Sequence, residues 1–152
     1  CNMRFHLIDK LISFTEWKEA SALKNVTYGN PEFINENHYM DDTLLLESMF
    51  QCAAWLIVIS SGQKLRPTIV TAEGYQIYEH ASPGEQLIIT ITIEDYNAEY
   101  ATIRGEVYKK DKLCVTLKNA ILKLVDTWEL EDPEITKKYI KYLTQKRGDV
   151  GI

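Results

Sequence analysis

The chain has 152 residues, of which 45% are hydrophobic and 26% are charged. This is the composition of a globular protein, and the length predicts one domain over residues 1–152. The formal net charge of -5 gives no overall positive field, which argues against nucleic-acid binding. The three cysteines, Cys1, Cys52 and Cys114, have no C-x-x-C spacing, so we expect small buried hydrophobes in a reducing compartment and no metal site.

The N-terminal residues give no sign of export. Residues 1–20 carry several charges and no continuous apolar stretch, so we expect no signal peptide and a cytoplasmic protein. Cys1 and Asn2 precede Met3 and are interpreted as an expression remnant. The apolar run 43–59 is shorter than the ~20 residues that span a bilayer and is interrupted by polar residues, which favours a buried core helix over a membrane span.

The first half of the chain predicts a long helix. Residues 4–14 alternate loosely and predict a short helix or a bent strand, and residues 17–29 predict a strand that ends at a Gly-Asn-Pro turn. Asp41 and Asp42 are typical of a helix start, and the helix should run to Ser60-Ser61-Gly62. Because this segment is apolar on nearly every side, the helix should be enclosed on most of its faces.

The second half predicts strands and a final helix. β-branched and alternating residues indicate strands at 68–80, 87–96, 99–110 and 113–125, with a turn at 81–86 and a hairpin tip at Lys109 to Lys112. Asp132 as N-cap and Pro133 at the first helical position predict a short basic helix in the C-terminal tail, 132–152. One apolar helix followed by antiparallel strands predicts an α+β hotdog fold, with a curved sheet wrapped around the long central helix.

Five stretches, in order, resemble a known family. They are "MRFHLIDKLISF", "ALKNVT", "NPEFI", "MDDTLLLESMFQCAAWL" and "ASPGEQLIITITI". They resemble the 3-hydroxyacyl-acyl carrier protein dehydratases of fatty acid synthesis over about residues 3 to 125, and Glu47 with Gln51 matches the family's Glu-x-x-x-Gln on the central helix. The family's catalytic histidine lies in a G-H-F-P-G-x-P-V-M-P-G loop. The equivalent loop is shorter here, and His38 is the histidine that it contains.

The resemblance implies a lyase that removes water from a 3-hydroxyacyl thioester. It implies Glu47 as the catalytic acid, His38 as the base and Gln51 as a substrate-binding residue. It also implies a homodimer, since in the family the histidine of one subunit works with the glutamate of the other, and it leaves a trimer of dimers open. The substrate would arrive on the phosphopantetheine of acyl carrier protein, so we expect no cofactor and no metal in the protein itself.

The residue types suit this chemistry. Elimination of water needs a base for a C2 proton and an acid for the departing C3 hydroxyl. Histidine titrates near neutrality, which suits a base. Burial of Glu47 in an apolar helix would disfavour its charged form and raise its pKa, which suits an acid.

Each candidate residue also has a structural interpretation. Glu47 could bond a backbone group, Gln51 could be a satisfied core amide, and His38 could be an exposed loop residue. His6 and His80 are weaker candidates, and His80 is expected to face solvent at a strand end. We expect five tyrosines to cover the sheet and an interface: Tyr75, Tyr78, Tyr96, Tyr100 and Tyr108.

Two other functions remain open at this stage. A hotdog thioesterase also uses a carboxylate on the central helix. A noncatalytic subunit that binds acyl groups or a carrier protein is the second alternative. The basic tail residues predict a solvated helix end or a contact for an acidic carrier protein: Lys137, Lys138, Lys141, Lys146 and Arg147.

Overall fold

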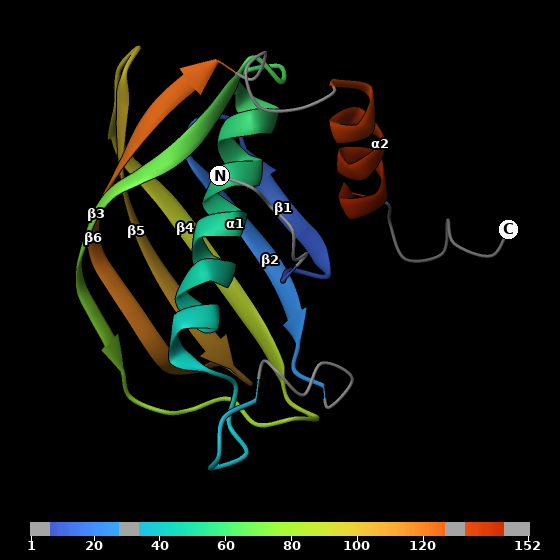
Figure 1. The fold of residues 1–152 in the computed structure, drawn as a ribbon, viewed down its shortest axis with the longest axis vertical. Coiled ribbons are helices and arrows are strands. Elements are labelled where there is room, and N and C mark those ends of the chain that lie inside the picture. The colour runs from blue at the N-terminus through green and yellow to red at the C-terminus, as the bar shows by residue number, and fades with distance from the viewer. Residues whose placement is uncertain (1–6, 28–33, 127–132, 145–152) are drawn as a thin grey trace, which may run out of the picture.

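A curved antiparallel sheet wraps one long helix in the computed structural model, which describes residues 7–27, 34–126 and 133–144. Figure 1 shows α1 lying across the concave face of the sheet, with α2 beside β1. The described elements are β1 (Lys10–Thr15), β2 (Glu19–Asn25), α1 (Asp42–Ser60), β3 (Leu65–Ile77), β4 (Gln86–Tyr96), β5 (Tyr100–Lys109), β6 (Lys112–Asp126) and α2 (Pro133–Thr144). The expected α+β architecture is confirmed.

The strand order of the six-stranded sheet is β1-β2-β4-β5-β6-β3, and every described neighbouring pair is antiparallel. β1 and β3 therefore form its two edges. Register shifts interrupt the ladders, as between Ile69 and Thr71 on β3 and between Ile93 and Asp95 on β4. Such irregularities bend strands and increase their twist, which helps the sheet to curve around the helix.

α1 begins and ends where the sequence predicts. The side chain of Asp41 caps the helix by accepting a hydrogen bond from the Thr43 N–H at 2.9 Å. At the other end, the Ser61 N–H donates to the Ile57 carbonyl, and Gly62 follows with φ of +64°. α1 is long and apolar enough to cross a membrane, but 67% of its apolar stretch is buried inside the fold. It is therefore the core helix that its composition predicts.

The core lies between α1 and the concave face of the sheet. β4 shows the alternation most clearly, since Leu87, Ile89, Ile91 and Ile93 are buried while the residues between them are more exposed. Cys52 and Cys114 are buried too, as expected of small hydrophobes, and burial raises the pKa of the Cys52 thiol to about 12. Cys1 lies outside the described residues.

Several expected element bounds shift in the structure. For the N-terminal segment, the strand alternative is confirmed over residues 10–15, because Lys10 to Thr15 pair with β2 and the register shifts between Leu11 and Ser13. β2 begins only at Glu19, since a turn at Trp17, with φ of +55°, precedes it. β3 starts before Pro67 and includes it, which an edge strand tolerates.

Other expectations concern residues that the structure does not describe. The 29–31 turn lies wholly outside the described residues, as do His6 and the expected cap Asp132. Pro133 is the first residue of α2, as expected.

Two glycines with positive φ provide a paired test of the β3–β6 ladder. Gly74 on β3 has φ of +69°, and a Cβ there would lie 2.8 Å from the Cβ of Lys118 on β6. Gly62 has a similar φ of +64° but open space around its Cα. We expect Gly62→Ala to lower the free energy of unfolding by about 1–2 kcal/mol, the cost of a left-handed alanine. Gly74→Ala should lose a further ~1–3 kcal/mol from the steric overlap.

Urea denaturation of both variants measures the difference. Equal losses would mean that β3 and β6 separate without cost at this point.

Candidate functional site

Glu47 lies in an apolar pocket beside α1. The pocket has a volume of ≈ 240 Å³ and lies between the middle of the helix, the first part of β3 and β6. Its lining residues are Glu47, Phe50, Gln51, Ala54, Pro67, Thr68, Ile69 and Leu122. The structure thus places two of the three predicted site residues, Glu47 and Gln51, against one cavity. They come together because they are four residues apart, which puts them on the same face of the helix.

Burial raises the pKa of Glu47 above the usual range of a carboxyl group. The side chain is half-buried, and apolar neighbours such as Phe50 and Ile69 disfavour its charged form. A carboxyl group with a raised pKa keeps its proton to a higher pH, and it can donate that proton to a leaving oxygen.

Gln51 connects the pocket to the N-terminal segment. Its side-chain oxygen accepts a hydrogen bond from the Leu7 N–H at 2.8 Å, and the residue is only 3% exposed. The Gln51 side-chain oxygen therefore has a hydrogen-bond partner inside the core, as expected if Gln51 has a structural role. The residue still lines the pocket beside Glu47, and its role in substrate binding stays a prediction.

His38 lies in a tight loop before α1. Asn35 organises this loop, because its side-chain oxygen accepts hydrogen bonds from the N–H groups of Asn37 and Tyr39 at 3.0 Å each. His38 itself is exposed and adopts φ of +64°. Its ring forms no hydrogen bond or ion pair with another residue of the described chain, and it does not line the Glu47 pocket.

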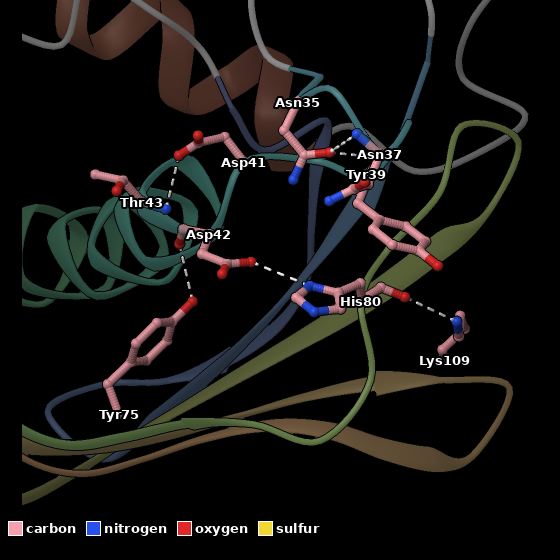
Figure 2. Close-up of polar contacts among 9 residues, drawn as sticks. All are labelled: Asn35, Asn37, Tyr39, Asp41, Asp42, Thr43, Tyr75, His80 and Lys109. Carbon is pink, nitrogen blue, oxygen red and sulfur yellow. Dashed lines mark hydrogen bonds and ion pairs between the residues drawn. The ribbon is translucent and has the colours of Figure 1, made fainter.

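The His80 side chain lies next to the first turn of α1, a position that the sequence analysis does not predict. Its Nδ1 is 3.2 Å from Oδ1 of Asp42, and its ring stacks on Tyr39 with centroids 4.9 Å apart. Figure 2 shows the ring between these two side chains, with Lys109 on its other side. The side chain is 43% exposed, as the expectation of a solvent-facing histidine requires, but it also has these two specific contacts, which the sequence did not predict.

The course of β3 explains this contact. The strand runs back along α1, so that the Tyr75 hydroxyl near its end donates to the Asp42 carbonyl at 2.9 Å. Burial, with the nearby charges of Asp42 and Asp41, raises the pKa of Tyr75. The segment after β3 then continues past the helix start, and the Met40 N–H donates to the Ala81 carbonyl at 2.7 Å. The sequence alone does not predict the contact between His80 and Asp42, because the contact depends on the direction in which β3 runs along α1.

The other candidate residues lie away from this site or outside the described residues. Tyr96 and Tyr100 are exposed at the ends of β4 and β5, and Tyr78 is exposed just after β3. Lys137, Lys138 and Lys141 are exposed on α2, whereas Lys146 and Arg147 are not described. Among the described residues, no group of three or more His, Cys, Asp or Glu side chains is placed to hold a metal ion.

Comparison of the fold with solved structures identifies its class. The dehydratase heterocomplex ApeI:P from Xenorhabdus doucetiae matches with a TM-score of 0.65 over 88% of this chain and 89% of that chain, at 11% identity. A hypothetical thioesterase with coenzyme A from Streptococcus pneumoniae matches with a TM-score of 0.64 over 77% of this chain and 88% of that one, at 10% identity. At these identities the likeness concerns the fold alone, which is the hotdog fold.

Curated sequences identify the family within this class. The 3-hydroxyacyl-[acyl-carrier-protein] dehydratase FabZ of Rhodospirillum rubrum is 31% identical over 119 residues, which cover 73% of this chain and 72% of that protein. The FabZ of Gluconacetobacter diazotrophicus is 30% identical over 109 residues, just under two thirds (66%) of each chain. No family model matches the chain. The chain belongs to the FabZ family of 3-hydroxyacyl-[acyl-carrier-protein] dehydratases, as a divergent member.

The raised pKa of Glu47 predicts a pH-dependent cost of keeping this side chain in the fold. Between the pKa of an unfolded glutamate, about 4.3, and the higher pKa in the fold, the folded state binds more protons. Stability contributed by this residue therefore falls as pH rises through that interval. We expect Glu47→Gln to be more stable, relative to the unsubstituted protein, at about pH 8 than at about pH 4.

Urea unfolding at both pH values measures this difference. Glu94→Gln is the matched control, because Glu94 is exposed on β4, away from the pocket and from the β3 edge, and should give no such trend. A stability difference for Glu47→Gln that is identical at the two pH values would contradict the burial argument.

Proposed function

We propose that the protein is a dehydratase that converts 3-hydroxyacyl thioesters to trans-2-enoyl thioesters in fatty acid or specialised lipid synthesis. The observation that carries the proposal is Glu47: a half-buried carboxyl group with a raised pKa, against an apolar pocket that it shares with Gln51. It occupies the family's glutamate position on the central helix. The apolar lining of the pocket suits an acyl chain.

The proposed reaction is a proton-assisted elimination. A histidine takes the C2 proton, and the electron pair of that C–H bond forms the C2=C3 double bond. The C3–O bond breaks, and Glu47 protonates the leaving hydroxyl, which departs as water. Two histidines lie near the start of α1, and His38 is the one to which the sequence assigns the first step. Proton exchange with solvent restores both groups, so no cofactor is required.

A homodimer paired through β3 completes the proposed site. β3 is a 13-residue edge strand with Ile69 and Val70 exposed at 45% and 51%, and long apolar edges need a cover. Two-fold pairing of this edge with its copy makes one continuous sheet. The Glu47 pocket is lined by the same strand, so the partner would close it.

The proposed substrate carrier is acyl carrier protein, as the names of the FabZ relatives indicate for those enzymes. Its phosphopantetheine arm would deliver the acyl group to the pocket. The protein would act in the cytoplasm, where the proposed substrate is made.

The activity test is hydration of a crotonyl thioester, followed by the loss of enoyl absorbance. We expect turnover by the unsubstituted protein and a kcat at least ~100-fold lower in Glu47→Gln, because the amide cannot donate the proton. Glu94→Gln, which changes an exposed carboxylate on the internal strand β4, serves as the matched control and should retain activity. A folded dimer that hydrates no enoyl thioester of any acyl chain length would contradict the proposal.

Two measurements on the same samples separate the alternatives. Release of free thiol from saturated acyl thioesters, dependent on Glu47, would assign a thioesterase. Binding of acyl carrier protein without turnover, and unchanged in Glu47→Ala, would assign a noncatalytic subunit.

The dimer has a matched test on the two sheet edges. Val70 on β3 and Ile12 on β1 are both 51% exposed. Val70 lies one residue from the middle of β3, so antiparallel pairing brings its two copies close together. We expect Val70→Lys to shift the protein toward monomer, since like charges then face each other, and Ile12→Lys to leave the dimer intact. Sedimentation velocity measures both, and dissociation by Ile12→Lys alone would place the interface on β1.

A further inference from the structure

We infer that His80, held by Asp42, is the base that removes the C2 proton, in place of the histidine that the family carries in its loop. This inference rests on the proposed dehydratase function and assigns a residue to it. It starts from the different environments of the two histidines near the start of α1. His80 is held in one orientation by contacts on two sides, whereas the His38 ring has no hydrogen bond or ion pair within the described chain.

The contact with Asp42 sets the proton positions on the His80 ring. An ionised carboxylate can only accept hydrogen bonds, so Nδ1, 3.2 Å from Asp42 Oδ1, carries the proton. In the neutral ring, Nε2 then carries the lone pair that can accept a proton from substrate. His80 would thus be the base and Asp42 the group that orients it, which are the two groups that proton abstraction needs.

The surroundings of His80 fix the ring and leave it accessible. Tyr39 stacks on one face, with 16° between the ring planes. Lys109 donates from Nζ to the His80 backbone carbonyl at 3.1 Å and also pairs with Glu79 and Glu85 at 3.0 and 2.8 Å. The neighbouring segment is therefore anchored, as Figure 2 shows for the Lys109 contact. With 43% of its side chain exposed, His80 can still be reached by a substrate.

The loop around His38 argues against the alternative. A base must hold its nitrogen within about 2.6–3.2 Å of the proton that it removes. His38 is exposed at a left-handed position of a short loop, and no contact in the described chain orients its ring. Its neighbour Tyr39 contacts His80, so the loop supports the His80 ring.

The proposed dimer would supply the acid for His80 from the other subunit. Asp42 and Glu47 are five residues apart, which is ~140° around a helix of 3.6 residues per turn, so they lie on different sides of α1. In the proposed dimer, antiparallel pairing of the two β3 edges would bring the start of one β3 beside the end of the other. The partner subunit's Glu47 pocket, which the start of β3 borders, would then lie toward the end of β3 that leads to His80.

In the resulting step, Nε2 of His80 takes the C2 proton and becomes protonated. The C–H electron pair forms the double bond, the C3–O bond breaks, and the partner subunit's Glu47 gives its proton to the departing oxygen. The products are the enoyl thioester and water. Solvent exchange then returns a proton to Glu47 and removes one from His80.

The test compares kcat and KM of four variants of the full chain on a crotonyl thioester: His80→Ala, His80→Asn, His38→Ala and Lys110→Ala. His80→Asn is the decisive variant, because the asparagine amide can still donate to Asp42 but cannot take a proton. We expect both His80 variants to lower kcat by about 100-fold or more with KM changed by less than about threefold. The loss should exceed that of His38→Ala by at least about tenfold, and the exposed control Lys110→Ala should retain full activity.

Each other outcome overturns the assignment. Full kcat in His80→Asn alongside a loss in His80→Ala would reduce His80 to a positioning residue that holds Asp42 and Tyr39. A loss in His38→Ala that equals or exceeds that of the His80 variants would give the base to His38. Urea unfolding confirms that each variant is folded, and His80→Asn carries the test if His80→Ala does not fold. An unsubstituted protein without hydration activity defeats the proposed function itself, whereas active protein with unaffected His80 variants defeats only this inference.

Discussion

The enclosure of α1 by the curved sheet is the constraint on which the site depends. Twelve residues of this helix are buried, so a carboxyl group on it cannot be solvated as it would be on a surface helix. Glu47 lies where the enclosure is incomplete, at a pocket that β3 and β6 border from the sheet. The carboxyl group is therefore desolvated enough for its pKa to rise and open enough for a substrate to reach it. A fully buried position would give the first property without the second.

The connection from α1 to β3 determines which residues can meet at the helix start. β3 occupies the far edge of the sheet and runs back along the helix. Its first residues, Pro67 to Ile69, border the Glu47 pocket, while Tyr75 near its end bonds the helix start. One strand thus links the acid-bearing pocket with the region of His80. Because that strand is also an edge, antiparallel pairing with a second copy would bring opposite ends together, and a single chain could not.

The sequence could predict the features that depend on local pattern. The apolar run with Asp41 at its start determines α1 almost to the residue, since capping and burial both act on that segment alone. The strands after it follow from alternation. The position of Glu47 and Gln51 on one helix face follows from their spacing, and the structure puts both at one pocket.

The missed features depend on long-range pairing. The His80–Asp42 contact joins residues 38 positions apart, and the strand β3 between them has to be placed on the sheet before the contact can be foreseen. The hydrogen bond from Leu7 to Gln51 spans 44 positions and is equally hidden in the sequence. The predicted start of β3 is too late because of Pro67. Proline disfavours central strands, and the strand order is needed to identify β3 as an edge strand that tolerates it.

The short loop before α1 and the His80 contact are structurally linked. A loop with few residues between Ile34 and Met40, which pair with each other, has little length with which to carry its own histidine toward a substrate. The same short loop places Tyr39 against the His80 ring and leaves Asp42, the first residue of α1, within reach of Nδ1. The short loop thus contributes to the environment of a histidine in a distant segment of the chain. A site of this kind is recognised by the contacts of its groups and not by their positions in a motif.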